Sequence, residues 1–162
     1  MRRILVIGCP GSGKSAFARA LRAAVGLPLR HLDKLYWNMD GTHVSREVFR
    51  ARLAYVLRQP SWIIDGNYGS TLAWRLQFCD TVLFLDYPLE VCLDGIRERK
   101  GQPRSDMPCL MPEGESEKFL TVVREFYSAN RSAVMGLLRA YPDKTTVIFQ
   151  SRAEAAAFLA NL

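Results

Sequence analysis

The sequence predicts an α/β domain with a parallel sheet covered by helices on both faces, and three observations lead to this fold class. Short apolar runs alternate along all 162 residues with stretches that carry apolar side chains at helical spacing. The runs are largely continuous in apolar character, as in strands that are covered on both faces. The first run passes through a Gly-rich turn directly into a helical stretch, which is how β-α-β units begin. A chain of this length is expected to form one domain spanning 1–162.

Five short apolar runs are expected to be the strands of this sheet. Their ranges are 3–7, 29–32, 62–64, 81–85 and 145–149. Right-handed crossovers between parallel strands place every strand-to-helix loop at one edge of the sheet, where ligands bind in such folds. Residues that directly follow these runs are therefore the first candidates for a functional site.

Helices are expected between the strands, with recognisable start and stop signals. One helix has Ser45 placed to cap it and Pro60 to end it, and another is opened by Pro88 in its first turn. A longer helix is expected at about 116–139, and the last begins at Ser151 with a capping box. The apolar residues expected to face the core are Phe49, Leu53, Val56 and Leu57, then Leu89, Cys92, Leu93 and Ile96, and finally Phe119, Val123 and Phe126.

Composition excludes several classes of protein. A hydrophobic content of 49% with 23% charged residues is typical of a soluble globular protein, and no stretch approaches a membrane span. The apolar run after Met1-Arg2-Arg3 has four residues, whereas the core of a signal peptide needs about 7–15, so we expect a cytoplasmic protein. The four cysteines form no C-x-x-C pair, which favours reduced thiols over a zinc site or disulfides. A net charge of +6 suits an anionic partner, either phosphorylated small molecules or nucleic acid.

The first strand-to-helix turn is a complete G-x-x-x-x-G-K-[ST] phosphate-binding loop. It reads Gly8-Cys9-Pro10-Gly11-Ser12-Gly13-Lys14-Ser15. Glycines allow successive backbone N–H groups to turn inward around a phosphate, and the helix N-terminus adds its free donors and positive dipole end. Lys14 is expected to act on the β- and γ-phosphates, and the Ser15 hydroxyl is expected to bind Mg²⁺. The predicted cofactors are therefore ATP and Mg²⁺, with Gly8, Pro10, Gly11, Ser12, Gly13, Lys14 and Ser15 around the nucleotide.

Three acidic residues follow predicted strands and are candidates for chemistry. Asp65 is the favoured acidic anchor for the metal, together with Ser15. Asp86 is the second candidate, although a residue before Tyr87-Pro88 also fits the start of a helix. Asp33 is placed to orient an acceptor hydroxyl or take its proton, or else to be a helix-start or turn residue.

A cationic stretch and several isolated residues complete the candidates. The stretch 97–104 holds four cations, and a flap hinged at Gly101 and Gly114 would bring them over a transferring phosphoryl group, but a solvated loop is the alternative. His31 and His43 have no partner at ligand spacing and are expected to be structural or on the surface. The three tryptophans, Trp37, Trp62 and Trp74, are expected to form core or pocket walls.

Several strings together resemble the adenylate-kinase-related P-loop proteins often labelled DNA topology modulation proteins. Besides the phosphate loop, the strings are H-L-D-K-L-Y-W at 31–37, W-I-I-D-G-N-Y at 62–68, F-L-D-Y-P at 84–88, R-S-D at 104–106 and F-Q-S-R at 149–152. The resemblance runs through the whole chain in order. It implies a nucleoside-monophosphate-kinase-like three-layer sandwich with a five-stranded parallel sheet ordered 2-3-1-4-5 and a short lid at about 100–114.

The same resemblance implies roles for particular residues. Asp65 matches the acid that holds magnesium-bound water in adenylate kinases, and Arg99 matches the arginine at the base of the lid. Arg104, together with Asp106, matches the R-x-D element of the lid whose arginine contacts the transferring phosphates. Arg152 falls in the loop that contacts adenine.

One departure from that pattern leaves the acceptor open. Adenylate kinases carry an arginine two residues after Asp-Gly for the acceptor's phosphate, whereas Asn67 and Tyr68 follow Asp65-Gly66 here and Arg75 is the nearest cation. The predicted function is an ATP-dependent small-molecule kinase acting on a nucleoside monophosphate or a related small acceptor, with catalytic residues Lys14, Arg99, Arg104 and Asp33. The alternatives are a shikimate-type kinase with a hydroxyl acceptor and a nucleotide-binding regulator acting on DNA. Nucleic acid is not favoured, because the basic residues are dispersed and no nucleic-acid-binding signature occurs.

Overall fold

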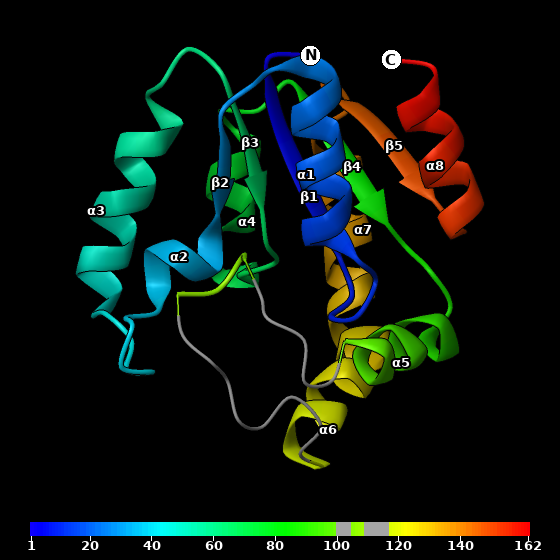
Figure 1. The fold of residues 1–162 in the computed structure, drawn as a ribbon. Helices are drawn as coiled ribbons and strands as arrows, with labels where there is room; N and C mark the ends of the chain where they lie inside the picture. The colour runs from blue at the N-terminus through cyan, green and yellow to red at the C-terminus, as the bar shows by residue number, and fades with distance from the viewer. Residues whose placement is uncertain (100–104, 109–116) are drawn as a thin grey trace.

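The protein folds around a five-stranded parallel sheet, shown in Figure 1. The computed structural model describes residues 1–99, 105–108 and 117–162. The strands are β1 (Arg3–Gly8), β2 (Leu29–His31), β3 (Trp62–Asp65), β4 (Thr81–Leu85) and β5 (Thr145–Phe149). Their order is β2-β3-β1-β4-β5, and all four pairings are parallel. The predicted fold class and strand order are confirmed, and each strand agrees with its predicted range to within one residue at either end.

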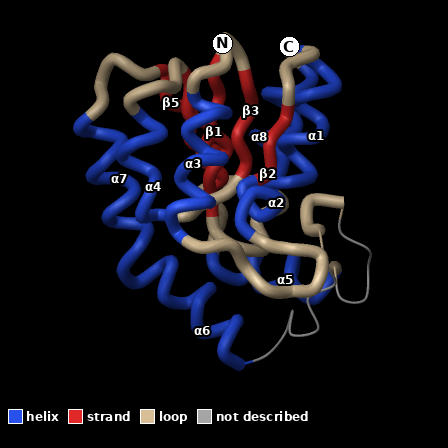
Figure 2. Tube along the Cα trace, turned by 90° about the vertical axis from the view of Figure 1, so that its left-hand side faces the viewer, coloured by secondary structure: helices blue, strands red, loops and turns tan. Residues whose placement is uncertain are grey.

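Helices cover both faces of the sheet and one of its edges. They are α1 (Lys14–Val25), α2 (Leu32–Tyr36), α3 (Arg46–Leu57), α4 (Gly69–Leu76), α5 (Leu89–Glu98), α6 (Glu117–Glu125), the π-helix η1 (Phe126–Asn130), α7 (Arg131–Ala140) and α8 (Arg152–Ala160). Figures 1 and 2 show α1 and α8 on one face and α4 and α7 on the other. Helices α5 and α6 lie beyond the carboxyl ends of the strands, and both chain termini lie at the opposite edge (Figure 1). Within the described ranges, no helix combines the length and apolar character needed to cross a bilayer.

The predicted helix starts at Ser45 and Ser151 are confirmed by capping hydrogen bonds. The N–H of Val48 donates to Ser45 Oγ at 3.3 Å, and the N–H of Glu154 donates to Ser151 Oγ at 3.2 Å. The predicted helix at 116–139 is interrupted by the π-turn of η1, which separates α6 from α7. Helices α2 and α4 were not expected, because with five and eight residues they are too short to show a clear helical spacing of apolar side chains.

The strand order determines which loops meet at the ligand-binding edge. β1 occupies the centre of the sheet, and Ile4, Leu5 and Val6 are completely buried. β3 lies next to it with Val6 opposite Asp65, and β2 follows with His31 opposite Asp65. The loops after β1, β3 and β2 therefore lie side by side.

Candidate active site

The phosphate-binding loop folds tightly between β1 and α1. Gly13 is the N-cap residue of α1 and has a φ of +84°, in the left-handed region that favours glycine. The Ser12 N–H donates to the Cys9 carbonyl at 3.1 Å, and the Lys14 ammonium donates to the same carbonyl at 3.1 Å. The lysine is thereby folded back over the loop, with its charge held at the N-terminus of α1.

The backbone of helix α5 packs directly against the backbone of the phosphate loop. Gly11 has a φ of +86°, and a Cβ placed on it would lie 2.0 Å from the carbonyl oxygen of Cys92. A Cβ on Gly95 would lie 2.1 Å from the Gly11 carbonyl oxygen. Both positions therefore require glycine for the loop to rest on α5.

Arg152 lies beside the same contact. Its Nη2 is 3.1 Å from the position that a Cβ on Gly95 would take, and it forms an ion pair of 3.1 Å with Glu98. Arg152 is the first residue of α8 and about half exposed. The residue is thus located next to the nucleotide loop, and its contact with adenine stays a prediction.

Asp65 ends β3 beside the phosphate loop and is nearly buried. Its Oδ2 lies 2.8 Å from Nδ1 of His31, which is itself buried. Its Oδ1 is buried and has no hydrogen-bond partner among the described residues. A buried carboxylate oxygen without a partner is costly, and a cation would compensate it. His31 is buried, in agreement with a structural position, and its contact with Asp65 could not be expected from sequence spacing because neighbouring strands bring together residues 34 positions apart.

The surroundings of Lys14 show that the structure brings several predicted residues together. Burial lowers the pKa of Lys14, and the negative charges of Asp65 and Asp33 oppose this shift. The Arg99 guanidinium lowers the pKa of Lys14 further. Asp65, Asp33 and Arg99 therefore each lie within electrostatic reach of Lys14.

The cationic stretch is only partly described. Arg99 follows the last turn of α5, and its Cζ lies 5.6 Å from the centre of the Phe119 ring. Arg104, most of the predicted lid at 100–114 and its proposed hinges at Gly101 and Gly114 lie outside the described residues. Asp106 is described and is nearly buried, and the Ser15 hydroxyl donates to its Oδ2 at 3.0 Å.

Arg75 organises the loop that follows Asp65. Its guanidinium is completely buried and donates to the carbonyl oxygens of Gly66 at 3.0 Å, of Asn67, and of Tyr68 at 3.3 Å. It also donates to the Thr71 hydroxyl at 3.2 Å. Burial lowers the pKa of Arg75 to about 10. Arg75, the cation nearest to Asp65-Gly66 in sequence, therefore binds the backbone carbonyls of the loop.

The same loop contacts both neighbouring loops through side chains. Asn67 Oδ1 accepts a hydrogen bond of 3.0 Å from the Gly8 N–H of the phosphate loop. The Tyr68 hydroxyl donates to Asp33 Oδ1 at 2.8 Å. Tyr68 has a φ of +36°, which is strained for a residue other than glycine and is maintained by the contacts around it. The loop therefore links the phosphate loop to the candidate base Asp33.

A cluster of rings surrounds this side of the site. Tyr36 stacks on His43 with ring centres 5.0 Å apart and meets Tyr68 edge-on at 5.4 Å. Phe49 lies 5.1 Å from Tyr68, and Trp37 lies edge-on to His43 at 5.9 Å. The prediction that His43 is structural or on the surface agrees with this position, since His43 is exposed and packs on Tyr36. Packing between aromatic rings therefore stabilises the region around Tyr68, the residue that donates to Asp33.

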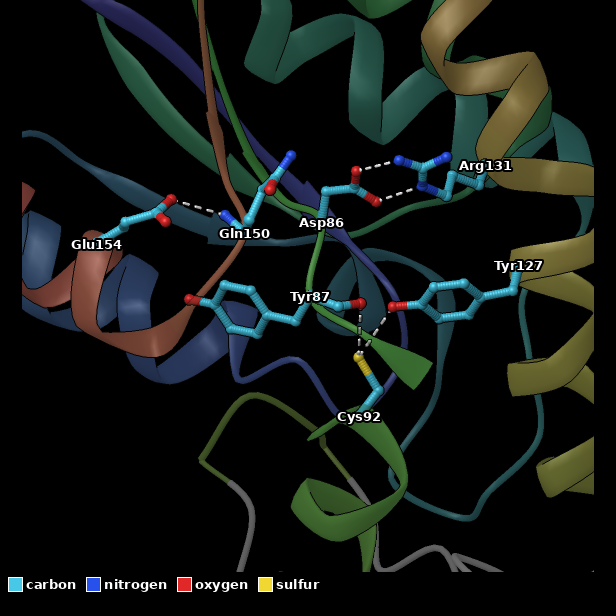
Figure 3. Close-up of polar contacts among 7 residues, drawn as sticks. All are labelled: Asp86, Tyr87, Cys92, Tyr127, Arg131, Gln150 and Glu154. Atoms are coloured by element: carbon cyan, nitrogen blue, oxygen red, sulfur yellow. Dashed lines mark hydrogen bonds and ion pairs between the residues drawn. The ribbon is translucent and has the colours of Figure 1, made fainter. Parts of the chain in front are cut away.

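Asp86 has a different role from both of those considered for it. Arg131 of α7 binds its carboxylate with two hydrogen bonds, 2.7 Å from Nε and 2.6 Å from Nη2, as Figure 3 shows. The N-cap residue of α5 is Pro88, so Asp86 does not start that helix. Its carboxylate is occupied by a bidentate ion pair with α7, which is not the arrangement expected of a metal ligand.

Two thiols lie between the phosphate loop and α5. The Cys92 sulfur is 3.8 Å from the Tyr127 hydroxyl and 3.9 Å from the Tyr87 carbonyl oxygen (Figure 3). The neighbouring Cys9 thiol lowers the pKa of Cys92, whereas the Cys92 thiol and burial raise the pKa of Cys9. Cys9, Cys79 and Cys92 are free thiols, and Cys109 lies outside the described residues.

The oxygen ligands near the phosphate loop fit magnesium. Ser15 offers its hydroxyl, and Asp65 offers a buried carboxylate oxygen without a partner among the described residues. Among the residues that the structure describes, no group of three or more His, Cys, Asp or Glu side chains is placed to hold a metal. Mg²⁺ is usually bound by one or two carboxylates together with substrate phosphates and water, so a protein cage is not required.

Comparison with solved structures shows the same class of fold. No protein-family model and no curated protein matches the sequence. The chain is similar to shikimate kinase from Acinetobacter baumannii in complex with shikimate, with a TM-score of 0.65, 16% identity and coverage of 99% of this chain and 90% of that one. Shikimate kinase from Bacteroides thetaiotaomicron matches with a TM-score of 0.59, 17% identity and coverage of 99% and 95%. A gluconokinase from Sinorhizobium meliloti 1021 matches with a TM-score of 0.56, 19% identity and coverage of 99% and 92%.

These likenesses define the fold, which is that of the P-loop kinases with strand order 2-3-1-4-5. At identities of 16% to 19% they do not reach the narrower adenylate-kinase-related group that the sequence resembles. Its label and its particular activity stay predictions.

Four residues make contacts in the site region that the sequence did not predict, and they are His31, Tyr68, Gly95 and Arg131. His31 and Tyr68 act through contacts with Asp65 and Asp33, which no local pattern shows. Gly95 is a glycine inside an amphipathic helix, and such a glycine is itself a signal of close packing. Arg131 gave no local signal, because its partner Asp86 lies 45 positions away in sequence.

Proposed function

We propose that this protein is an ATP-dependent kinase that transfers the γ-phosphoryl group to a hydroxyl of a small molecule. The observation that carries the proposal is the folded phosphate loop, with Lys14 in electrostatic reach of the two carboxylates Asp65 and Asp33. Shikimate kinases and a gluconokinase share the fold at nearly full coverage, which supports a small-molecule acceptor.

The position of Arg75 favours a hydroxyl acceptor over a nucleoside monophosphate. A phosphorylated acceptor needs a cation at its phosphate, but Arg75 is completely buried and donates to loop carbonyls. Asp33, by contrast, lies in the first turn of α2, directly after β2, and its carboxylate accepts a hydrogen bond of 2.8 Å from the Tyr68 hydroxyl. A carboxylate fixed in this way can orient a hydroxyl and accept its proton during transfer.

Each residue of the site then has a defined task. The loop amides and Lys14 bind the β- and γ-phosphates, and Arg99 adds positive charge where negative charge develops. Ser15 and Asp65 would hold Mg²⁺, which when bound shields the charges of the β- and γ-phosphates. Arg104 and Arg152 would contact the transferring phosphates and the adenine, as the resemblance implies. Asp33 orients the acceptor for attack in line with the leaving group.

A panel of acceptors in a coupled assay for ADP tests this proposal. The panel contains cyclic polyol acids, sugar acids, nucleosides and nucleoside monophosphates, each with Mg²⁺-ATP, and Lys14→Ala serves as the blank. We expect ADP to form with a hydroxyl acceptor that lacks phosphate. Turnover with nucleoside monophosphates alone would contradict the hydroxyl assignment, and absence of ATP binding by calorimetry would contradict the kinase itself.

A role on DNA, suggested by the label of the similar group and by the net charge of +6, predicts a different result. Binding to DNA should then be measurable and should fall steeply as salt increases, because phosphate contacts release counterions. We expect no such binding, since the basic residues are dispersed along the chain. A steep salt dependence of DNA affinity would overturn this expectation.

A further inference from the structure

We propose that Asp106 is a second carboxylate of the magnesium site, acting beside Ser15 when Mg²⁺-ATP is bound. The inference rests on the proposed function and assigns Asp106 a role at the metal. Its starting point is the hydrogen bond of 3.0 Å that the Ser15 hydroxyl donates to Asp106 Oδ2. The two residues are 91 positions apart, so the tertiary fold has brought this carboxylate to the hydroxyl that the phosphate-loop motif assigns to Mg²⁺.

The distance between the two oxygens suits a shared metal ion. Mg²⁺ binds oxygen in a near-ideal octahedron at about 2.0–2.1 Å, so two adjacent ligands lie about 3.0 Å apart. Ser15 Oγ and Asp106 Oδ2 already have this separation. An ion could bind both oxygens after the serine proton turns away, with little movement of either side chain.

Charge gives a second and independent reason. Asp106 is 6% exposed, and Ser15 lies in the first turn of α1, whose N-terminus is the phosphate site. Phosphates bound at that N-terminus would bring further negative charge near the Asp106 carboxylate, and like charges that share a partly buried site repel. A divalent cation between the carboxylate and the phosphates would offset this repulsion, in addition to the contacts that Asp106 makes with other residues.

If Asp106 binds the metal, the increase in ATP affinity that Mg²⁺ produces should depend on the Asp106 carboxylate. Calorimetric titration of ATP, with MgCl₂ or with EDTA, measures this dependence for the wild type and for Asp106→Asn. We expect the variant to lose at least about 10–100-fold of the affinity for Mg²⁺-ATP, because loss of an outer-shell group already costs this much and Asp106 is proposed as a direct ligand. Its affinity for metal-free ATP should be unchanged or higher, because a repelling charge is gone.

Two further variants make the test specific. Asp94→Asn removes an equal charge from an exposed residue that pairs with Arg97, and it should retain the wild-type magnesium dependence. Asp106→Glu keeps the carboxylate and should recover part of the loss. Electron paramagnetic resonance with Mn²⁺ in place of Mg²⁺ gives a readout without turnover, and Asp106→Asn should bind Mn²⁺-ATP more weakly than the wild type.

Several outcomes would overturn the inference. An unchanged magnesium dependence in Asp106→Asn would show that Asp106 only caps Ser15. Tighter binding of Mg²⁺-ATP by that variant would show that Asp106 blocks the site. Either result leaves the kinase proposal intact, whereas a wild type that binds ATP neither with nor without Mg²⁺ contradicts the proposed function as well.

Discussion

The two halves of the ligand-binding edge are built in different ways. The nucleotide half, at residues 8–15, relies on backbone N–H groups and a lysine that are contiguous in sequence. The acceptor half follows β2 and β3 and relies on side-chain contacts between residues 34 and 35 positions apart, His31 with Asp65 and Tyr68 with Asp33.

This difference decides how each half tolerates change. A site made of backbone needs glycine at a few positions and otherwise depends little on its neighbours. A site made of interlocking side chains can vary in specificity, but it is sensitive to the residues that hold it. We therefore expect substitutions in the nucleotide half to abolish chemistry in an intact fold, and those in the acceptor half to alter stability and acceptor affinity together.

The largest effect is expected from Lys14→Ala in the nucleotide half. Turnover should fall about 10²–10³-fold, or about 2.7–4 kcal/mol, as for the loss of one preorganised donor. Steady-state kinetics with saturating acceptor measure the change. Near wild-type turnover would count against the nucleotide site.

The stability of the same variant offers a check on the charge of Lys14. Burial lowers the pKa of Lys14 below its usual value of 10.5, so its charged form opposes folding at neutral pH. That penalty fades as pH rises from the lowered pKa to 10.5, and the stability of the wild type relative to Lys14→Ala should rise over this window. Urea unfolding at several pH values measures the trend, and an opposite slope would contradict it.

A smaller effect, on stability, is expected from Arg75→Met in the acceptor half. The change leaves the carbonyls of Gly66, Asn67 and Tyr68 without this donor, and we expect a loss of about 2–3 kcal/mol in the free energy of unfolding. Urea unfolding measures it, and KM for the acceptor should rise more than KM for ATP. Arg52→Met is the control, since Arg52 is exposed and its side chain makes one hydrogen bond with the described residues, to the Leu35 carbonyl. Equal stabilities of the two variants would show that Arg75 does not organise the loop.

The smallest effect is expected from Tyr68→Phe. The change removes one hydrogen bond to the Asp33 carboxylate and retains the ring contacts, so the activation free energy of the transfer should rise by about 1.5 kcal/mol. The cost should appear in kcat with the hydroxyl acceptor, because Asp33 loses the group that orients it. ATP affinity, measured by calorimetry, should stay at the wild-type value. A change confined to ATP affinity would contradict this prediction, because it would show that Tyr68 acts on the nucleotide half and not on Asp33.

The fold and the position of the phosphate loop between β1 and α1 could be predicted from sequence because their determinants are local. Continuous apolar runs predict buried parallel strands, and the phosphate-loop motif specifies its own conformation. The acceptor half could be predicted only in part, since Asp33 and Asp65 follow strands but their partners do not lie near them in sequence. The ion pair of Asp86 with Arg131 was missed for the same reason, because it joins β4 to a helix 45 residues later. The role of Arg104 and the form of the lid stay predictions.

The meeting of Gly11 with Gly95 has a consequence for how this protein can evolve. The two residues are far apart in sequence, yet a methyl group on either would enter the backbone of the other's segment. Relatives that keep this arrangement should therefore inherit both glycines as a pair. A sequence with the phosphate motif but a bulkier residue at the second position must tilt α5 away from the loop, which would also move Arg99, the C-cap residue of α5.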